Sequence, residues 1–367
     1  MIKGITQSYC KEMEENNNKK ITIADVAKLA GVSKGTVDRV LHDRGGVSRK
    51  SMEKIRQVID ELGYEPNVYA SMLATRRDHS IACILPESEK DDYWYLVREG
   101  FEKGGENISS MNISTRLFYY DQYSPESFRK ACLQMLETNP SGVVLPPFFK
   151  NDTYTLVNSL ALHNIPYVYV DAKLEDDNYF AYYGMPMYKS GYLCAHLLTL
   201  RTQPKHLKGV LVVRIIRDKM RQSDPTINRR SGFLDYMAEN FPSSVIHNVF
   251  IDPHDVRDTE SQLKSFFKSH PDIRHVVMFN SRVHLLVDFL SRNPDPDRVV
   301  MGFDNLEKNI SALRNGQISG LICQHTDLQS YNAVMALSDY IIKHRRPERR
   351  DNFMHMDILT ALNADNY

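Results

Sequence analysis

The chain has no excess of charge of either sign, because its 367 residues include 46 basic and 46 acidic side chains. It also lacks an apolar run near the roughly 20 residues that a membrane-spanning helix needs. Its N-terminus mixes lysines with glutamates and has neither the apolar core nor the cleavage site of a secretory signal. We therefore expect a soluble globular protein that does not enter a membrane, with about two or three domains.

Metal-binding and catalytic motifs are also missing. The wide spacing of the cysteines excludes a Cys-x-x-Cys motif, and their odd number favours reduced thiols in a cytoplasmic protein. Phosphate-binding, dinucleotide-binding, zinc-protease and nucleophile-elbow motifs are all absent. The sequence therefore predicts no catalytic residue, no metal and no cofactor. The five cysteines are Cys10, Cys83, Cys132, Cys194 and Cys323.

The most informative segment lies near the N-terminus. Thr22, Ser33 and Ser48 each precede a run in which apolar residues recur every three or four positions. A hydroxyl before such a run can cap the N–H groups of an amphipathic helix, so three short helices are predicted. The link Gly31-Val32-Ser33 is as tight as in a helix-turn-helix, whose second helix enters the DNA major groove. The alternative is a generic three-helix bundle.

These residues resemble a known family. The segment ITIADVAKLAGVSKGTVDRVL (residues 21–41), with VS at 47–48 and LGYEPN at 62–67, is similar to the DNA-binding headpiece of the LacI (lac repressor) family. The resemblance implies that the second helix presents base-reading side chains while hydroxyls hold phosphates. The DNA contacts implied for the headpiece are Thr22, Ser33, Lys34, Gly35, Thr36 and Arg39.

Two residues of the second helix depart from the family. Gly35 has no side chain with which to read a base, whereas Arg39 could make a bidentate contact to guanine. Asp38 stands where the family commonly has serine. Its carboxylate could accept from a cytosine amino group or pair with Arg39 or Arg44, so the operator sequence stays open.

Residues 67–74 have a helix-compatible composition but are too short to form an isolated helix, which needs about 12 to 15 residues. In the LacI family this segment is a hinge helix that orders in the minor groove. The resemblance implies that Asn67 and Ala70 contact DNA and that Leu73 wedges into the central base step of a palindrome. The alternative is a passive linker.

The overall neutrality of the chain conceals an uneven charge distribution. Residues 19–77 hold twelve basic and seven acidic side chains, a net charge of +5 that leaves −5 on the remainder. This modest basic excess agrees with a DNA-binding segment but supports only weak non-specific attachment.

From residue 80 onward, short apolar runs alternate with amphipathic helical patterns. Such alternation predicts parallel sheets covered on both faces, and the length favours two sheets. Examples of the helical patterns are residues 93–108, 125–136, 188–200, 227–240 and 328–344. The predicted strands are residues 81–85, 114–119, 142–146, 167–170, 210–214, 249–251, 275–279, 299–302 and 320–323.

The looser resemblance of this portion to the LacI family implies an α/β sensor of two Rossmann-like lobes, as in periplasmic binding proteins, with a ligand cleft at the carboxyl ends of the strands. The expected domains are a disordered N-terminal extension at 1–20, a helix-turn-helix headpiece at 21–66, a hinge helix and linker at 67–78, and the ligand-sensing domain at 79–367. Within the last, the N-lobe is expected at about 79–180 plus 325–354 and the C-lobe at about 181–324 plus 355–367.

The resemblance also implies the ligand-binding residues, with Arg230 as an alternative to Arg229. Ser281 stands where the family has an aspartate after the asparagine, Pro186 also replaces an aspartate, and Phe149 lies beside Phe148 where sugar binders carry a polar group. A sugar or sugar derivative is the expected ligand, and a nucleoside or another small polar metabolite stays open. The implied ligand-binding residues are Tyr93, Trp94, Phe148, Arg229, Asn280, Asp304 and Gln324.

Together these features predict a ligand-responsive transcriptional regulator, not an enzyme. It would act as a homodimer on a palindromic double-stranded DNA operator, controlling carbohydrate genes in response to a small-molecule effector. One alternative is a sugar- or nucleotide-processing enzyme with an appended helix-turn-helix. Another is a binding protein without DNA function, which residues 21–74 disfavour.

Overall fold

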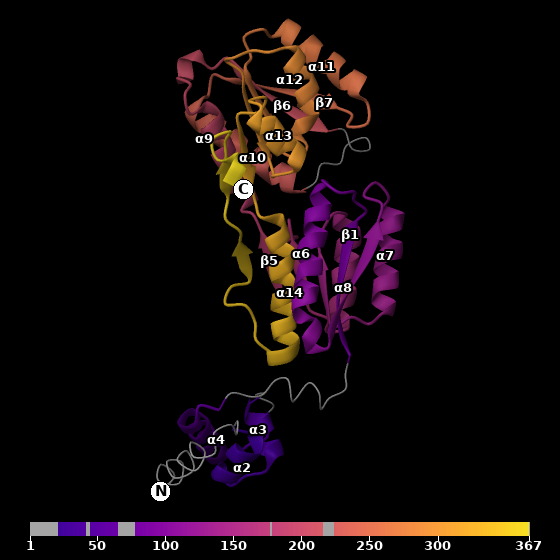
Figure 1. Ribbon diagram of the computed structural model, residues 1–367, viewed down its shortest axis with the longest axis vertical. Helices are drawn as coiled ribbons and strands as arrows, with labels where there is room; N and C mark the ends of the chain where they lie inside the picture. Colours follow the sequence, from indigo (N-terminus) through magenta and orange to yellow (C-terminus); the bar gives the residue numbers. More distant parts are fainter. Residues whose placement is uncertain (1–20, 42–44, 65–77, 177, 216–223, 367) are drawn as a thin grey trace. The chain divides into compact units, whose positions relative to one another are not determined.

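The computed structural model describes residues 21–41, 45–64, 78–176, 178–215 and 224–366. The chain divides into two compact units, one formed mainly by residues up to 77 and the other by nearly all residues from 78 onward. The first is a small helical unit, and the second contains both sheets (Figure 1). The expected extension at 1–20 and hinge at 67–77 lie outside the described residues.

The helical unit has the three helix starts that the sequence predicts. The Ser33 hydroxyl accepts a hydrogen bond from the backbone N–H of Thr36 at 3.2 Å, and the Ser48 hydroxyl accepts from Ser51 at 3.2 Å. Gly31 ends the first helix in the left-handed conformation, with φ 65°, where glycine avoids the strain of a side chain. Val26, Val37 and Ile55, one from each helix, are fully buried together. The helices are α2 (Ile23–Ala30), α3 (Lys34–Leu41) and α4 (Arg49–Leu62).

The second unit is built on two six-stranded sheets, which confirms the predicted α/β architecture. The first sheet has the order β11-β5-β4-β3-β1-β2 with every pair parallel. The second has the order β12-β10-β9-β8-β6-β7 and is parallel except for its β10–β12 pair. The strands are β1 (His79–Pro86), β2 (Ile113–Tyr120), β3 (Gly142–Leu145), β4 (Tyr167–Val170), β5 (Ala181–Gly184), β6 (Gly209–Ile215), β7 (Val245–Ile251), β8 (His275–Met278), β9 (Val299–Phe303), β10 (Gly320–Cys323), β11 (Asp351–Phe353) and β12 (Asp357–Leu359).

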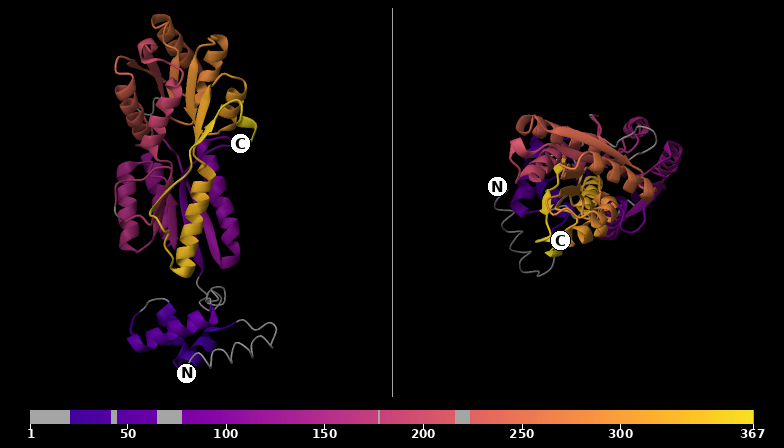
Figure 2. Two further views of the ribbon diagram at one scale, coloured as in Figure 1. Left: turned by 90° about the vertical axis from the view of Figure 1, so that its left-hand side faces the viewer. Right: turned by 90° about the horizontal axis from the view of Figure 1, so that it is seen from above.

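Helices cover both faces of each sheet, so that each sheet forms the centre of one lobe (Figure 2). The helices of this unit are α6 (Tyr93–Ile108), α7 (Pro125–Glu137), α8 (Lys150–Leu162), α9 (Met187–Thr199), α10 (Asp224–Asn240), α11 (Val256–Ser269), α12 (Val287–Arg292), α13 (Glu307–Arg314) and α14 (Thr326–Lys343). Short 3₁₀ turns lie at Ser109–Met111, Pro204–His206, Val283–Leu286 and Ala364–Asn366.

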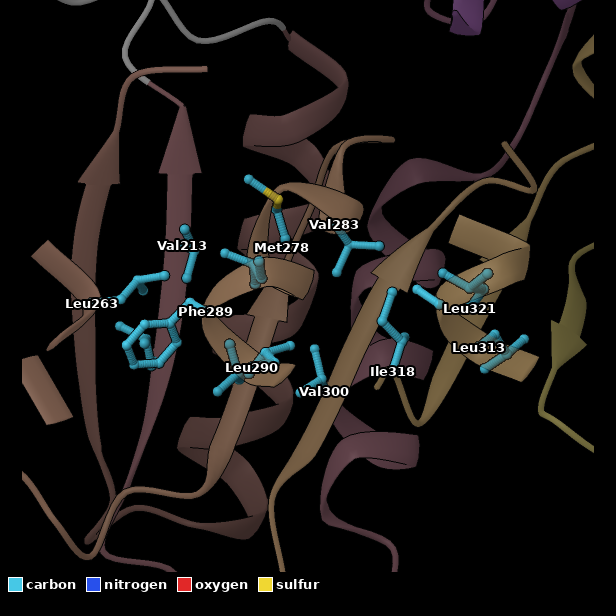
Figure 3. Packing of buried hydrophobic residues seen from close by; sticks show 14 of the residues in the cluster. Val213, Leu263, Met278, Val283, Phe289, Leu290, Val300, Leu313, Ile318 and Leu321 are labelled. Carbon is cyan, nitrogen blue, oxygen red and sulfur yellow. The ribbon is translucent and has the colours of Figure 1, made fainter. Parts of the chain in front are cut away.

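The apolar run of β6 shows why its sequence does not alternate with polar residues. Val210 and Val212 pack with α9 and α10 on one face, while Leu211 and Val213 pack toward α11, α12 and α13 on the other. Figure 3 shows Val213 in the second of these layers, together with Leu263 of α11 and Phe289 of α12. A parallel strand buried on both faces reads as a continuous apolar run.

Three short strands were not predicted from the sequence. β5 and β11 are at one edge of the first sheet, and β12 is at the edge of the second. Strands of three or four residues at an edge show too few positions for a periodic pattern to be recognised. Because β5 belongs to the first sheet, the chain first crosses between lobes after Gly184, not near residue 180 as expected.

The chain crosses back after β10 and a third time between β11 and β12. None of the helices in the described part of the chain is long and apolar enough to cross a membrane. Within the same residues there is no cluster of three His, Cys, Asp or Glu side chains suited to hold a metal ion.

Candidate functional site

A cleft opens between the lobes at the carboxyl ends of several strands. Phe148 lies beyond β3, Asn280 beyond β8 and Asp304 directly after β9. Loops at these ends of parallel sheets are where α/β proteins bind ligands. About 850 Å³ of empty space, solvent at the mouth included, lies between its walls. All seven predicted ligand residues line this cleft: Tyr93, Trp94, Phe148, Arg229, Asn280, Asp304 and Gln324.

A chain of hydrogen bonds runs across the base of the cleft. The Tyr93 hydroxyl donates to Asp171 Oδ1 at 2.6 Å. The Gln324 amide donates from Nε2 to the Tyr93 oxygen at 3.0 Å and to Asp304 Oδ1 at 2.9 Å. Gln329 supports this network, because its Oε1 accepts from the Asp171 backbone N–H at 2.9 Å. The network thus joins residues of the first lobe to Asp304 of the second.

Asp171 is a cleft residue that the sequence analysis missed. It directly follows β4 and has φ 66°, a left-handed conformation that aspartate tolerates better than most residues. Its side chain is largely buried. The available signal was its position immediately after the apolar run of residues 167–170.

Arg229 is buried in the second lobe, with only 3% of its surface exposed. Its Nη1 donates to the Phe279 carbonyl at 2.9 Å, and its guanidinium carbon lies 4.3 Å from the centre of the Phe303 ring. Its Nε finds no hydrogen-bond partner among the described residues. Arg229 lines the cleft, so its guanidinium places a positive charge in the wall of the second lobe. Arg230, the alternative, does not line the cleft.

The close packing of two helices positions Arg229. A Cβ at Gly191 of α9 would lie 1.7 Å from the Arg229 carbonyl oxygen, and one at Gly232 of α10 would lie 2.0 Å from the Tyr188 carbonyl oxygen. Glycine at both points therefore lets the backbones of α9 and α10 touch. This approach holds the first part of α10 against the floor of the cleft.

The Asp304 carboxyl is 2% exposed and has φ 67°. Burial raises its pKa to about 6, while the Arg229 charge and the hydrogen bond from Gln324 act in the opposite direction. Neutral and ionised forms therefore both exist near neutral pH. The ionised form accepts hydrogen bonds only, so a ligand hydroxyl can donate to it.

Asn309 supports the loops that carry these residues, and the sequence analysis missed it. Its fully buried amide donates from Nδ2 to the carbonyl oxygens of Ser281 at 2.8 Å and of Asp304 at 3.1 Å. Its Oδ1 accepts from the His284 backbone N–H at 3.1 Å. Asn309 thereby connects the loops after β8 and β9. Nothing in the sequence distinguishes it from an ordinary polar residue of an amphipathic helix.

One sector of the cleft is apolar. The Trp94 ring centre lies 6.2 Å from that of Phe148, edge to face. Phe148 in turn contacts Tyr120 and Phe149, at 6.3 and 5.1 Å between ring centres. Pro146 and Pro147 complete this part of the wall. The cleft therefore offers polar groups on one side and aromatic surface on the other.

The helical unit presents the predicted DNA-contacting side chains of α3 to solvent. Ser33, Lys34 and Arg39 are exposed, and the Ser33 and Thr36 hydroxyls lie 2.9 Å apart. The Thr22 hydroxyl donates to Asp25 Oδ2 at 2.6 Å, so its proton is already engaged. Gly35 is exposed, and a Cβ there would meet only the Ser33 hydroxyl oxygen, at 3.9 Å. The remaining predicted DNA contacts, Asn67, Ala70 and Leu73, and also Arg44, lie outside the described residues.

An α/β unit whose two lobes enclose a polar and aromatic cleft, preceded by a helix-turn-helix, defines a DNA-binding protein combined with a periplasmic-binding-type ligand domain. Residues 22–67 match the family of bacterial regulatory proteins of the lacI type, and residues 81–344 match the periplasmic binding protein domain. The chain belongs to the LacI family of regulators.

Several named relatives are transcriptional regulators. The regulator DegA of Bacillus subtilis is 30% identical over 148 residues, 40% of this chain and 42% of DegA. The chain thus matches less than half of DegA. The ribose operon repressor of Lactococcus lactis is 24% identical over 291 residues, 78% of this chain and 81% of that repressor.

Solved structures show the same fold in the second unit. A putative LacI transcriptional regulator from Bacteroides fragilis is 30% identical, with TM-score 0.74, and the match covers 79% of this chain and all of that one. GanP, a glucose-galactose binding protein from Geobacillus stearothermophilus, has TM-score 0.67 at 16% identity, with 78% of this chain and 99% of GanP covered. The second likeness supports the fold alone.

Proposed function

We propose that this protein is a ligand-responsive, sequence-specific transcriptional regulator that controls genes of carbohydrate metabolism. The observation that carries the proposal is the cleft itself, where the guanidinium of Arg229 and the carboxyl of Asp304 are both buried in the wall. A donor and an acceptor placed together suit hydroxyl groups, which both donate and accept. The aromatic surface of Trp94 and Phe148 suits the C–H face of a sugar ring.

The DNA-binding half of the proposal rests on the exposed face of α3. Lys34 and Arg39 would read base edges while Ser33 and Thr36 hold phosphates. We retain the division into a headpiece at 21–66, a hinge at 67–78 and a sensor domain at 79–367. The resemblance to regulators, together with the lack of catalytic motifs in the sequence, supports binding without chemical turnover.

We further propose a homodimer on a palindromic operator. Two headpieces must be held together for two half-sites to be read, and a two-fold sensor dimer would do this. Closure of the cleft on an effector would change the energy of the DNA-competent arrangement, a coupling typically of about 1–3 kcal/mol. A tetramer found by light scattering would contradict the dimer.

The ligand half is tested by a thermal-shift screen of sugars and related metabolites. The best hit is then repeated on Asp304→Ala, which removes the buried carboxyl. We expect the ligand-induced shift to disappear in the variant, and a shift equal to that of the wild type would mean that the ligand binds elsewhere.

The DNA half is tested with an operator selected from a random-sequence library. Arg39→Ala should weaken binding to the selected sequence by about 1–3 kcal/mol and relax its sequence preference. Arg56→Ala, an exposed arginine of α4, is the matched control and should leave the preference unchanged. Leu73→Ala should weaken operator binding while ligand binding remains. Equal operator affinity in all variants would contradict this part of the proposal.

A further inference from the structure

The cleft has a polar sector and an apolar sector. Tyr93, Asp304 and Gln324 are joined by hydrogen bonds, and Arg229 lies buried in the same polar sector. The apolar sector consists of Trp94, Pro146, Pro147 and Phe148. A ligand that touches both sectors needs hydroxyls on one side and C–H groups on the other.

The apolar sector packs against buried aromatic residues of the first lobe. Phe148 packs on the fully buried Tyr120, and Phe149 packs on the fully buried Phe128 with ring centres 5.4 Å apart. Proline and phenylalanine side chains carry no hydrogen-bonding group. A ligand hydroxyl pressed against the proline and phenylalanine side chains of this wall would lose water without gaining a side-chain partner, which lowers affinity.

The charges of the cleft argue against an acidic ligand. Among the described residues, two largely buried carboxyls, those of Asp171 and Asp304, line the polar sector together with one buried cation, Arg229. Nearer the rim, Glu87 and Asp92 outnumber Arg282. In the described part of the cleft, a phosphate or carboxylate on the ligand would therefore meet more negative than positive charge at short range, while a neutral hydroxyl would find acceptors.

We propose that the cleft selects an uncharged sugar that presents a methyl or methylene group, in place of a hydroxyl, to Phe148 and Trp94. The 6-deoxyhexoses are sugars of this kind, since they carry a methyl group where the parent hexose has CH₂OH. The inference rests on the proposed function, because it specifies the ligand of the same cleft.

The test measures binding to the full-length protein by isothermal titration calorimetry. The probes are matched pairs of 6-deoxyhexose and parent hexose: L-fucose with L-galactose, L-rhamnose with L-mannose, D-fucose with D-galactose, and D-quinovose with D-glucose. The 6-phosphate and the uronate of each available parent are included. We expect one deoxy sugar to bind about 10 to 100 times more tightly than its parent, the range that an apolar pocket achieves against an added hydroxyl. The charged forms should bind more weakly still.

The inference is overturned if a parent hexose, a phosphate or a uronate binds as tightly as the best deoxy sugar, or if no sugar of the panel binds. The proposed function fails on a different result, namely that operator binding responds to no ligand from the wider metabolite screen. If operator binding responds to a charged or non-sugar metabolite, the inference about the ligand is wrong, but the proposed function as a regulator still holds.

Variants of the wall give an independent readout. Phe148→Asn adds a hydrogen-bonding amide, so the ratio of deoxy to parent affinity should fall toward one or reverse. Phe148→Tyr retains the ring and adds one hydroxyl, so it should lower the affinity ratio by a smaller amount. This second variant provides the test if the asparagine variant does not fold. Phe353→Asn, an exposed aromatic residue of β11 outside the cleft, should leave the ratio unchanged. An unaltered ratio in both Phe148 variants would exclude this wall as the source of the preference.

Discussion

Replacing Asp304 with asparagine should stabilise the ligand-free protein above pH 6 while it removes ligand binding. Asparagine has the same shape, keeps an oxygen that can accept from Gln324, and tolerates the left-handed backbone at φ 67°. It differs chiefly in that it cannot ionise. The comparison therefore isolates the free-energy cost of holding a negative charge at a site that is 2% exposed.

The size and sign of the effect follow from the pKa of Asp304, which burial raises from its ordinary 3.8 to about 6. At about 1.4 kcal/mol per pKa unit, the ionised carboxylate destabilises the folded state by about 3 kcal/mol relative to the neutral acid. Because the folded pKa is the higher one, the folded state binds the proton more tightly. Its stability falls as the pH rises from about 4 to about 6, and the loss is complete above the folded pKa.

Urea unfolding of wild type and Asp304→Asn at pH 5.0 and pH 7.5 measures this cost. We expect the variant to be about 1–3 kcal/mol more stable at pH 7.5, and the difference to shrink at pH 5.0, where the wild-type carboxyl is largely protonated. The sugar-induced thermal shift should be absent from the variant. If the variant is less stable than wild type at pH 7.5 and the urea dependence of the unfolding free energy is the same in both, the buried Asp304 charge does not destabilise the folded state and the reasoning is wrong.

Three further substitutions test the packing around the sites. Gly191→Ala should lower stability by about 1–3 kcal/mol and weaken ligand binding, because its Cβ would lie 1.7 Å from the Arg229 carbonyl oxygen; an unchanged urea midpoint would contradict the close helix contact. Ser48→Ala should lower the free energy of unfolding of the helical unit by about 1 kcal/mol, because it removes the acceptor for the Ser51 N–H. The unfolding transition of this unit can be followed by its helical circular dichroism signal. Asn309→Ala should cost about 1–3 kcal/mol and reduce ligand affinity, since buried loop carbonyls lose their donor; retained affinity would show that the loops hold their position without it.

Elements of the fold could be predicted from the sequence where residues of one kind recur at regular spacing or stand at a characteristic position. The capping serines marked the starts of α3 and α4, and the apolar runs marked nine strands. Asp304 was predicted from the resemblance to the LacI family, in which an aspartate at this position binds the ligand. The short strands β5 and β11 escaped because pairing with neighbouring strands, and not local pattern, makes them strands.

The choice between Arg229 and Arg230 shows a limit of a different kind. Two adjacent helical residues point about 100° apart, so which of them enters the cleft depends on how α10 is rotated about its axis. That rotation is set by the contact of Gly191 and Gly232 with the neighbouring backbone, a tertiary feature. Asn309 was missed for a related reason, since one of its partners, the Ser281 carbonyl, lies in a loop 28 residues away in the sequence.

The backbone at the two buried acids also limits how this cleft can evolve. Asp171 and Asp304 both have positive φ, at 66° and 67°, where aspartate, asparagine and glycine are the residues that fit with least strain. A single substitution can thus exchange either carboxylate for an amide or remove the side chain, but it cannot readily install a lysine or an arginine. If the proposed function holds, adaptation toward an anionic effector would have to begin at the rim of the cleft, while changes at its base would alter which uncharged groups the cleft accepts.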